Sequence, residues 1–115
     1  MNAYQQERPV VVCLCGSTKF REAFQRVNRV ETLAGKIVLA PGCFQGDDGL
    51  DWLPEMKQRL DELHLRKIDL ADEILVVNVG GYIGLSIRQE IAYARQQGKP
   101  VRWLESGACG DENRE

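Results

Sequence analysis

Four short apolar runs alternate along the chain with longer segments in which apolar residues recur at helical spacing. The runs lie at 10–15, 36–40, 74–79 and 101–104. Their nearly continuous apolar character and β-branched residues are typical of parallel strands that are covered on both faces. The alternation predicts a small doubly wound, Rossmann- or flavodoxin-like α/β domain over residues 9–105, with about four or five parallel strands in three α/β/α layers. The polar ends, 1–8 and 106–115, are expected to be flexible.

Three amphipathic helices are predicted between the strands. Their apolar positions are Phe20, Phe24, Val27 and Val30 in the first, Leu53, Met56, Leu60 and Leu63 in the second, and Ile87, Ile91 and Ala94 in the third. The second helix is expected over residues 52–70, with Asp51 as its N-cap and Pro54 in its first turn. Gly35 and Gly98 are expected to end the first and third helices.

Residues 72–94 carry the clearest functional pattern, a buried strand followed at once by a glycine-rich turn and a helix. Glycine allows a backbone to approach a ligand closely, so the turn is a candidate floor for a binding site. Its glycines are Gly80, Gly81 and Gly84. Ser86 then stands where an N-cap is expected, with Gln89 as a capping-box partner, which predicts that the helix begins at Ile87.

Glu90 lies on this third helix, beside its apolar stripe rather than opposite it. Burial of a carboxylate raises its pKa unless a hydrogen bond or a positive charge stabilises the anion, and such a group resembles a tuned acid, base or nucleophile. The alternative is a solvated acid near the start of the helix, or one paired with Arg88 or Arg95.

A second polar turn, Gly16-Ser17-Thr18-Lys19, follows the first strand and precedes a helix. Free backbone N–H groups at the start of a helix and a nearby lysine favour an anion, which makes this turn a candidate phosphate or ribose site. The alternative is that Ser17 or Thr18 only caps the helix. The turn lacks the spacing of a Walker motif.

The loop at 41–51 follows the second strand, at the edge where open α/β sheets bind ligands, and Phe44 in it is a candidate for stacking on a base. Asp47 and Asp48 are more typical of a solvated turn than of a cation site. His64 and Asp69 follow near the end of the second helix, and a lone histidine there is a weak candidate for catalysis.

The formal net charge of -2 and the interspersed acidic and basic residues give no footprint for a nucleic-acid duplex and favour a small-molecule partner. Neither a membrane span nor a signal peptide is evident, so a cytoplasmic protein is expected. The chain has one histidine and no C-x-x-C pair, so neither a zinc site nor a cofactor is expected, and Cys13 and Cys15 are expected to be buried free thiols on one face of a strand.

The motifs LCGST at residues 14–18, NVGGYIG at 78–84 and the following EI-YA and GKPV segments resemble the nucleoside 2-deoxyribosyltransferase-like superfamily over about residues 10–104. The resemblance implies that Gly16 and Ser17 bind sugar or phosphate and that Glu90 attacks or stabilises the anomeric carbon. Ser86 matches a small hydroxyl residue that precedes the glutamate. The glycine turn is also similar to that of lysine-decarboxylase-like phosphoribohydrolases, whose longer motif is incomplete here.

The chain departs from the superfamily pattern at two positions. His64 stands where an aspartate is usual, and the spacing from Gly84 to Glu90 is longer than usual. The resemblance implies cleavage of the N-glycosidic bond of a nucleoside or nucleoside 5′-monophosphate, by hydrolysis or transfer, with Glu90 as nucleophile and His64 or Asp69 as acid. The alternative is a nucleotide-binding or sensor module that performs no chemistry.

A homo-oligomer, most simply a dimer, is also expected. A sheet this small leaves edge strands and apolar area exposed, and Tyr82 and Ile83 are expected to project from the glycine turn toward a partner. The resemblance implies the same, because members of the superfamily commonly complete their clefts with a neighbouring subunit.

Overall fold

The computed structural model describes residues 7–44 and 52–106, and within them four strands form one parallel sheet. The strands are β1 (Val11–Cys15), β2 (Ile37–Leu39), β3 (Glu73–Val76) and β4 (Val101–Trp103). Their order across the sheet is β2-β1-β3-β4, and every neighbouring pair is parallel. This is the arrangement of a small Rossmann/flavodoxin-like fold and confirms the predicted fold class.

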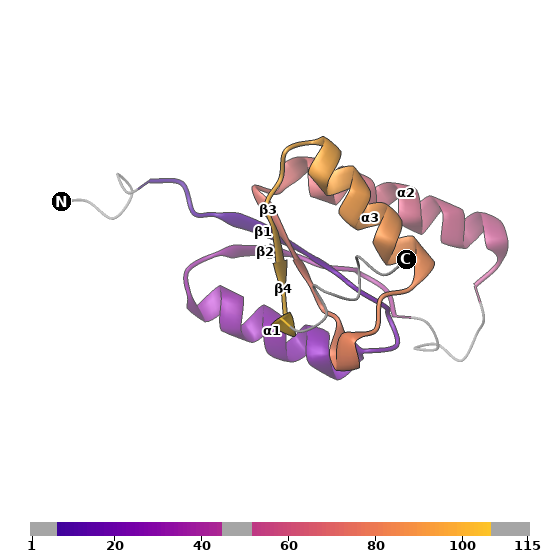
Figure 1. The fold of residues 1–115 in the computed structure, drawn as a ribbon, viewed down its shortest axis with the longest axis horizontal. Coiled ribbons are helices and arrows are strands. Elements are labelled where there is room, and N and C mark those ends of the chain that lie inside the picture. Colours follow the sequence, from indigo (N-terminus) through magenta and orange to yellow (C-terminus); the bar gives the residue numbers. More distant parts are fainter. Residues whose placement is uncertain (1–6, 45–51, 107–115) are drawn as a thin grey trace.

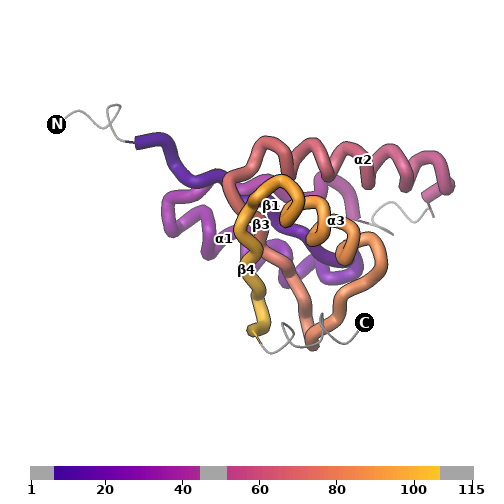
Figure 2. The backbone as a smooth tube through the Cα atoms, turned by 45° about the horizontal axis from the view of Figure 1, so that its top comes forward, coloured from indigo at the N-terminus to yellow at the C-terminus, as the bar shows by residue number. Residues whose placement is uncertain are grey.

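Three helices cover the two faces of the sheet (Figure 1). Helix α1 (Arg21–Leu33) lies on one face, and α2 (Pro54–Leu70) and α3 (Leu85–Gln96) lie together on the other. Right-handed connections between parallel strands explain this division, because the chain crosses the sheet in one direction from β1 to β2 and in the opposite direction afterwards. Figure 2 shows α2 and α3 side by side over the sheet.

Alternate residues of β1 contribute to two separate hydrophobic clusters. Val12 and Leu14 pack in the cluster beneath α1, whereas Cys13 and Cys15 pack in the cluster beneath α2 and α3. All four side chains are completely buried, as the apolar run predicts. The alternation therefore turns both thiols toward the two helices that carry His64 and Glu90.

The buried face of α2 is not the one expected. Leu53, Met56 and Leu63 are exposed, whereas His64 and Ile68 are buried. This helix has apolar residues on two adjacent stripes, and packing against β1 and α3 selects the stripe that contains Ile68, which turns His64 inward. Helix α2 begins at Pro54 with Leu53 at the N-cap, and the predicted cap Asp51 lies outside the described residues. In α1 the predicted core residue Val30 is also exposed.

The predicted capping box of α3 is wrong. The helix begins at Leu85, two residues earlier than expected, and Gly84 occupies the N-cap position in an extended conformation with no side-chain cap. Ser86 is therefore inside the first turn. Its hydroxyl accepts a hydrogen bond from Lys57 Nζ at 3.2 Å instead of capping its own helix.

Tyr82 and Ile83 do not share the exposed position expected of them. Ile83 is buried in the cluster beneath α2 and α3, while Tyr82 is half-exposed and packs its ring edge-to-face against Phe20. Leu33, Leu70 and Leu85 remain exposed, so apolar area is available for a partner and the homo-oligomer stays a prediction. None of the helices in the described parts of the chain is long and apolar enough to cross a bilayer.

Candidate functional site

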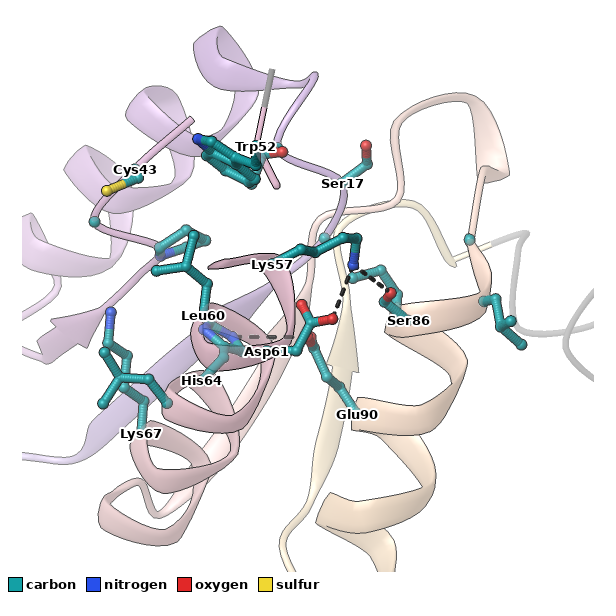
Figure 3. A pocket seen from close by; sticks show the side chains of 18 of the residues that line it. Ser17, Cys43, Trp52, Lys57, Leu60, Asp61, His64, Lys67, Ser86 and Glu90 are labelled. Atoms are coloured by element: carbon teal, nitrogen blue, oxygen red, sulfur yellow. Dashed lines mark hydrogen bonds and ion pairs between the residues drawn. The ribbon is translucent and has the colours of Figure 1, made fainter. Parts of the chain in front are cut away.

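A cavity of about 360 Å³ opens at the carboxyl edge of the sheet, between the turn after β1 and the helices α2 and α3 (Figure 3). This is the edge where open parallel sheets bind ligands. The predicted site residues that line it are Gly16, Ser17, Thr18, His64, Gly84, Ser86 and Glu90. The structure thus brings three separate parts of the predicted site together.

The turn after β1 forms one wall of the cavity, and its shape depends on Gly16. A Cβ atom at Gly16 would lie 2.7 Å from the carbonyl oxygen of Val77, so no side chain fits there. Ser17 Oγ accepts a 3.3 Å hydrogen bond from the backbone N–H of Lys19. Neither Ser17 nor Thr18 is the N-cap of α1, because Phe20 occupies that position without a side-chain cap. Both hydroxyl residues instead line the cavity.

Helix α2 supplies the opposite wall through residues one helical turn apart. Lys57, Asp61 and His64 follow each other at spacings of four and three, which places them on one stripe facing α3 (Figure 3). Lys57 Nζ donates to Asp61 Oδ2 at 2.8 Å and to Ser86 Oγ at 3.2 Å. A cation and two oxygen-bearing groups therefore meet at the mouth of the cavity.

Glu90 projects from α3 into the deeper part of the cavity, and its side chain is only 9% exposed. Its Oε1 lies 3.8 Å from His64 Nε2 and has no hydrogen-bond partner among the described residues. Burial raises the pKa of Glu90 to about 7, although the nearby His64 acts in the opposite direction. Glu90 is buried together with Ile87, Ile91 and Ala94, which confirms the prediction that it lies beside the apolar stripe rather than opposite it.

Two thiols lie directly behind His64. The Nε2 atom of His64 is 3.5 Å from Cys13 Sγ and 3.6 Å from Cys15 Sγ, and all three residues are buried. Contact with Cys15 lowers the pKa of Cys13 to about 6, while contact with Cys13 and burial raise the pKa of Cys15. Burial acts to lower the pKa of His64, but its contacts with Cys13 outweigh this effect and raise it. Sequence analysis gave these thiols no role beyond packing.

The structure does not bring every predicted residue to the cavity. Asp69 lies toward the other end of α2, where it accepts a 2.5 Å hydrogen bond from the hydroxyl of Tyr93 and pairs with Arg66. Phe44 packs edge-to-face against Phe24 of α1. Neither Asp69 nor Phe44 lines the cavity.

Three further predicted residues also lie outside the cavity lining. Lys19 Nζ lies 3.9 Å from the centre of the Tyr82 ring, a cation–π contact. Gly80 and Gly81 adopt positive φ angles of 65° and 82°. The backbone N–H of Gly80 donates to the carboxylate of Glu105 at 3.0 Å, so this turn binds an acid of its own chain.

Sequence analysis missed part of the α2 wall. Lys57, Leu60 and Asp61 all line the cavity, as does Lys67, whose Nζ donates to the Ala40 carbonyl at 2.8 Å. Trp52, which precedes α2, also lines it. A signal was present, because polar residues at 57, 61, 64 and 67 recur at helical spacing on one side of the predicted helix. The apolar pattern of the adjacent stripe concealed it.

Comparison with protein-family models and with curated proteins finds no match for this chain. The site combines a buried carboxylate, an imidazole, a hydroxyl-bearing turn and an exposed lysine around one cavity. Such a set can bind a polyhydroxylated or phosphorylated small molecule and place a carboxylate against it.

Proposed function

We propose that the protein cleaves the N-glycosidic bond of a nucleoside or nucleoside 5′-monophosphate, with Glu90 as the nucleophile. The observation that carries this proposal is the position of Glu90, a buried carboxylate whose Oε1 has no hydrogen-bond partner among the described residues and which opens into a cavity. A carboxylate that is shielded from water and lines a cavity is placed to attack an electrophilic carbon of a ligand bound there.

The reaction follows the two-step logic of retaining glycoside chemistry. A Glu90 oxygen forms a bond to C1′ as the bond from C1′ to the base nitrogen breaks, and the base leaves with the bonding electrons. His64 lies 3.8 Å from Glu90 in the same cavity and acts as the general acid that donates a proton to the leaving base. Of the two acids expected from the sequence, Asp69 lies too far along α2 to serve. Water or a second base then attacks C1′ and releases Glu90.

Substrate binding is assigned to the walls of the cavity. Ser17, Thr18 and Ser86 offer hydroxyl groups to a ribose or phosphate, and the adjacent Lys57 offers a positive charge. The half-exposed ring of Tyr82 offers a surface for stacking of the base. A cavity of about 360 Å³ is at the lower end of the range for small-molecule sites, which fits a nucleoside or a monophosphate.

The second candidate is a nucleotide-binding module without catalysis. The observation that favours it is the position of Lys57 at the cavity mouth, where its ammonium group can bind a phosphate without taking part in any reaction. In this case the same cleft would report the presence of a nucleotide rather than consume it.

One experiment separates the two candidates. The purified, metal-free protein is incubated with pooled nucleosides and 5′-monophosphates, and chromatography measures free base while a thermal shift measures binding. Release of free base supports the enzyme. A thermal shift without free base supports the binding module. If neither free base nor a thermal shift is detected, both candidate functions are contradicted.

A further inference from the structure

Three potential metal ligands converge behind the cavity. Cys13 and Cys15 are two residues apart on β1 and therefore point to the same face of the sheet, and α2 places His64 across both. The two sulfur atoms and a ring nitrogen of His64 all lie within 4.8 Å of one another. All three side chains are buried, so the cluster is held by the core and not by surface loops.

The distances match those of a tetrahedral metal site. Sulfur and nitrogen donors bound to zinc at about 2.3 Å and about 2.0 Å lie about 3.6 Å from each other. The Nε2 atom of His64 is 3.5 Å from Cys13 Sγ and 3.6 Å from Cys15 Sγ. The three donors thus have the nitrogen–sulfur spacing that a tetrahedral ion requires, and all of them lie within 4.8 Å of one another.

The three side chains cannot all form good hydrogen bonds with one another. A single imidazole nitrogen carries either one hydrogen or one lone pair, so His64 Nε2 can form a good hydrogen bond to only one of the two sulfur atoms. Glu90 Oε1, 3.8 Å from the same nitrogen, lacks a hydrogen-bond partner among the described residues. Buried polar groups in this condition are costly, and a cation held by the two sulfur atoms and the imidazole would satisfy those three and lie close to the Glu90 carboxylate.

We propose that Cys13, Cys15 and His64 bind a zinc-type divalent cation behind the cavity, with the carboxylate of Glu90 as fourth ligand. Two thiolates select zinc and similar ions over magnesium or calcium, which prefer oxygen donors. With four protein ligands the site is closed, the form typical of structural rather than catalytic zinc.

This site has a consequence that rests on the proposed function. A metal ion held by Glu90 and His64 occupies both the nucleophile and the acid, so the loaded protein is expected to release no base. The protein can then either bind the metal ion or cleave the glycosidic bond, but it cannot do both at once. Measurement of metal binding itself does not depend on any activity.

The test begins with protein stripped of metal by a chelator under reducing conditions and then titrated with Co²⁺. The expected result is saturation at a single ion per chain with the visible absorption of tetrahedral cobalt and the near-ultraviolet absorption of cobalt–thiolate bonds. Both bands should disappear when Zn²⁺ is added. Wild-type protein that develops neither band overturns the proposal.

Variants identify the ligands. Cys13→Ser and Cys15→Ser should each weaken the thiolate band, because one thiolate remains, and Cys13→Ser/Cys15→Ser should abolish it. The double variant Cys43→Ser/Cys109→Ser, which removes the other two thiols of the chain, should keep the wild-type spectrum. Glu90→Gln should keep the thiolate band and bind cobalt more weakly. Loss of the band in Cys43→Ser/Cys109→Ser, or a band of wild-type intensity in both Cys13→Ser and Cys15→Ser, contradicts the assignment.

A measurement on wild-type protein guards against variants that fail to fold. Addition of Zn²⁺ to the stripped protein should raise the melting temperature, because an ion bound only by the folded chain stabilises it. Cobalt bands without base release would support the metal site and contradict the proposed enzyme, and base release without cobalt bands would do the reverse.

Discussion

Two glutamates on opposite faces of the sheet are buried to almost the same degree, and their surroundings differ completely. Glu31 of α1 is 8% exposed and Glu90 of α3 is 7% exposed. Glu31 accepts hydrogen bonds from Arg102 at 2.5 Å and from Lys36 at 3.2 Å. The Oε1 atom of Glu90 has no such partner within the described chain and lies 3.8 Å from the imidazole Nε2 of His64.

The pKa values of the two carboxyl groups diverge for this reason. Burial acts to raise both. In Glu31 the hydrogen bonds with Arg102 and Lys36 outweigh burial and lower the pKa, whereas in Glu90 burial prevails and raises the pKa to about 7. A buried carboxylate matched by two cations stabilises the fold, while one left unmatched beside a cavity is available for a ligand, a metal or a reaction.

The largest expected effect comes from Glu90. Replacement Glu90→Gln keeps the shape of the side chain and removes the nucleophile, so base release by the metal-free protein should fall by roughly 10³-fold or more. The free energy of unfolding should not decrease, because the substitution removes a buried charge. The matched control is Glu62→Gln, on the exposed side of α2, which should retain activity. Equal turnover in both variants would remove Glu90 from the mechanism.

The opposite pattern is expected at Glu31. Replacement Glu31→Gln should lower the free energy of unfolding by about 1–2 kcal/mol, because Arg102 and Lys36 lose their closest carboxylate. The loss is limited because both cations are partly exposed and also lie within 3.5 Å of Glu73. Urea denaturation measures the effect, and base release should stay at the wild-type level. A variant as stable as the wild type would show that the cluster contributes nothing.

The contribution of Glu31 should depend on pH with a definite sign. Its folded pKa lies below the value of about 4.3 expected in the unfolded chain, so its stabilisation is fully present above that pH. The stabilisation is lost as the pH falls through the folded pKa, where Arg102 and Lys36 no longer face a charged partner. The stability difference between wild type and Glu31→Gln should therefore shrink below pH of about 4. A difference that grows there would contradict the assignment.

The smallest effect is expected from the lysines on the Glu90 side. Lys57→Met should weaken binding of a nucleoside 5′-monophosphate about fivefold and leave the matching nucleoside unaffected, because Lys57 lines the cavity. Lys19→Met should change neither the affinity for the monophosphate nor that for the nucleoside, since Lys19 packs on Tyr82 outside the cavity lining. Isothermal titration at low salt measures these affinities. Added salt should reduce the difference in monophosphate affinity between the wild type and Lys57→Met. A loss confined to Lys19→Met would restore the phosphate to the turn after β1.

Local patterns were sufficient for the elements of this fold. The continuous apolar runs identified all four strands, because a parallel strand must be apolar on both faces. The glycine-to-helix transition after β3 and the position of Glu90 beside Ile87 and Ile91 also follow from neighbours within one or two turns. Helix starts were less well determined, as the error at Ser86 shows, because Gly84 in an extended conformation can begin a helix without a side-chain cap.

The face of α2 could not be read from its own sequence. Two adjacent stripes of that helix carry apolar residues, and helical periodicity ranks them almost equally. The choice depends on the surfaces of β1 and α3, which bury Ile68 and His64 and leave Leu63 exposed. This choice is also what carries Lys57 and Asp61 to the cavity wall and Asp69 away from it.

The sequence by itself determined a small parallel α/β protein with a carboxylate on the buried side of its last helix. Only the tertiary structure decided which groups surround that carboxylate. His64 is separated from Cys13 by 51 residues and from Glu90 by 26, and no local pattern links positions so far apart. They meet because the strand order and right-handed connections place α2 and α3 over the same face of β1, where strand alternation already holds both thiols.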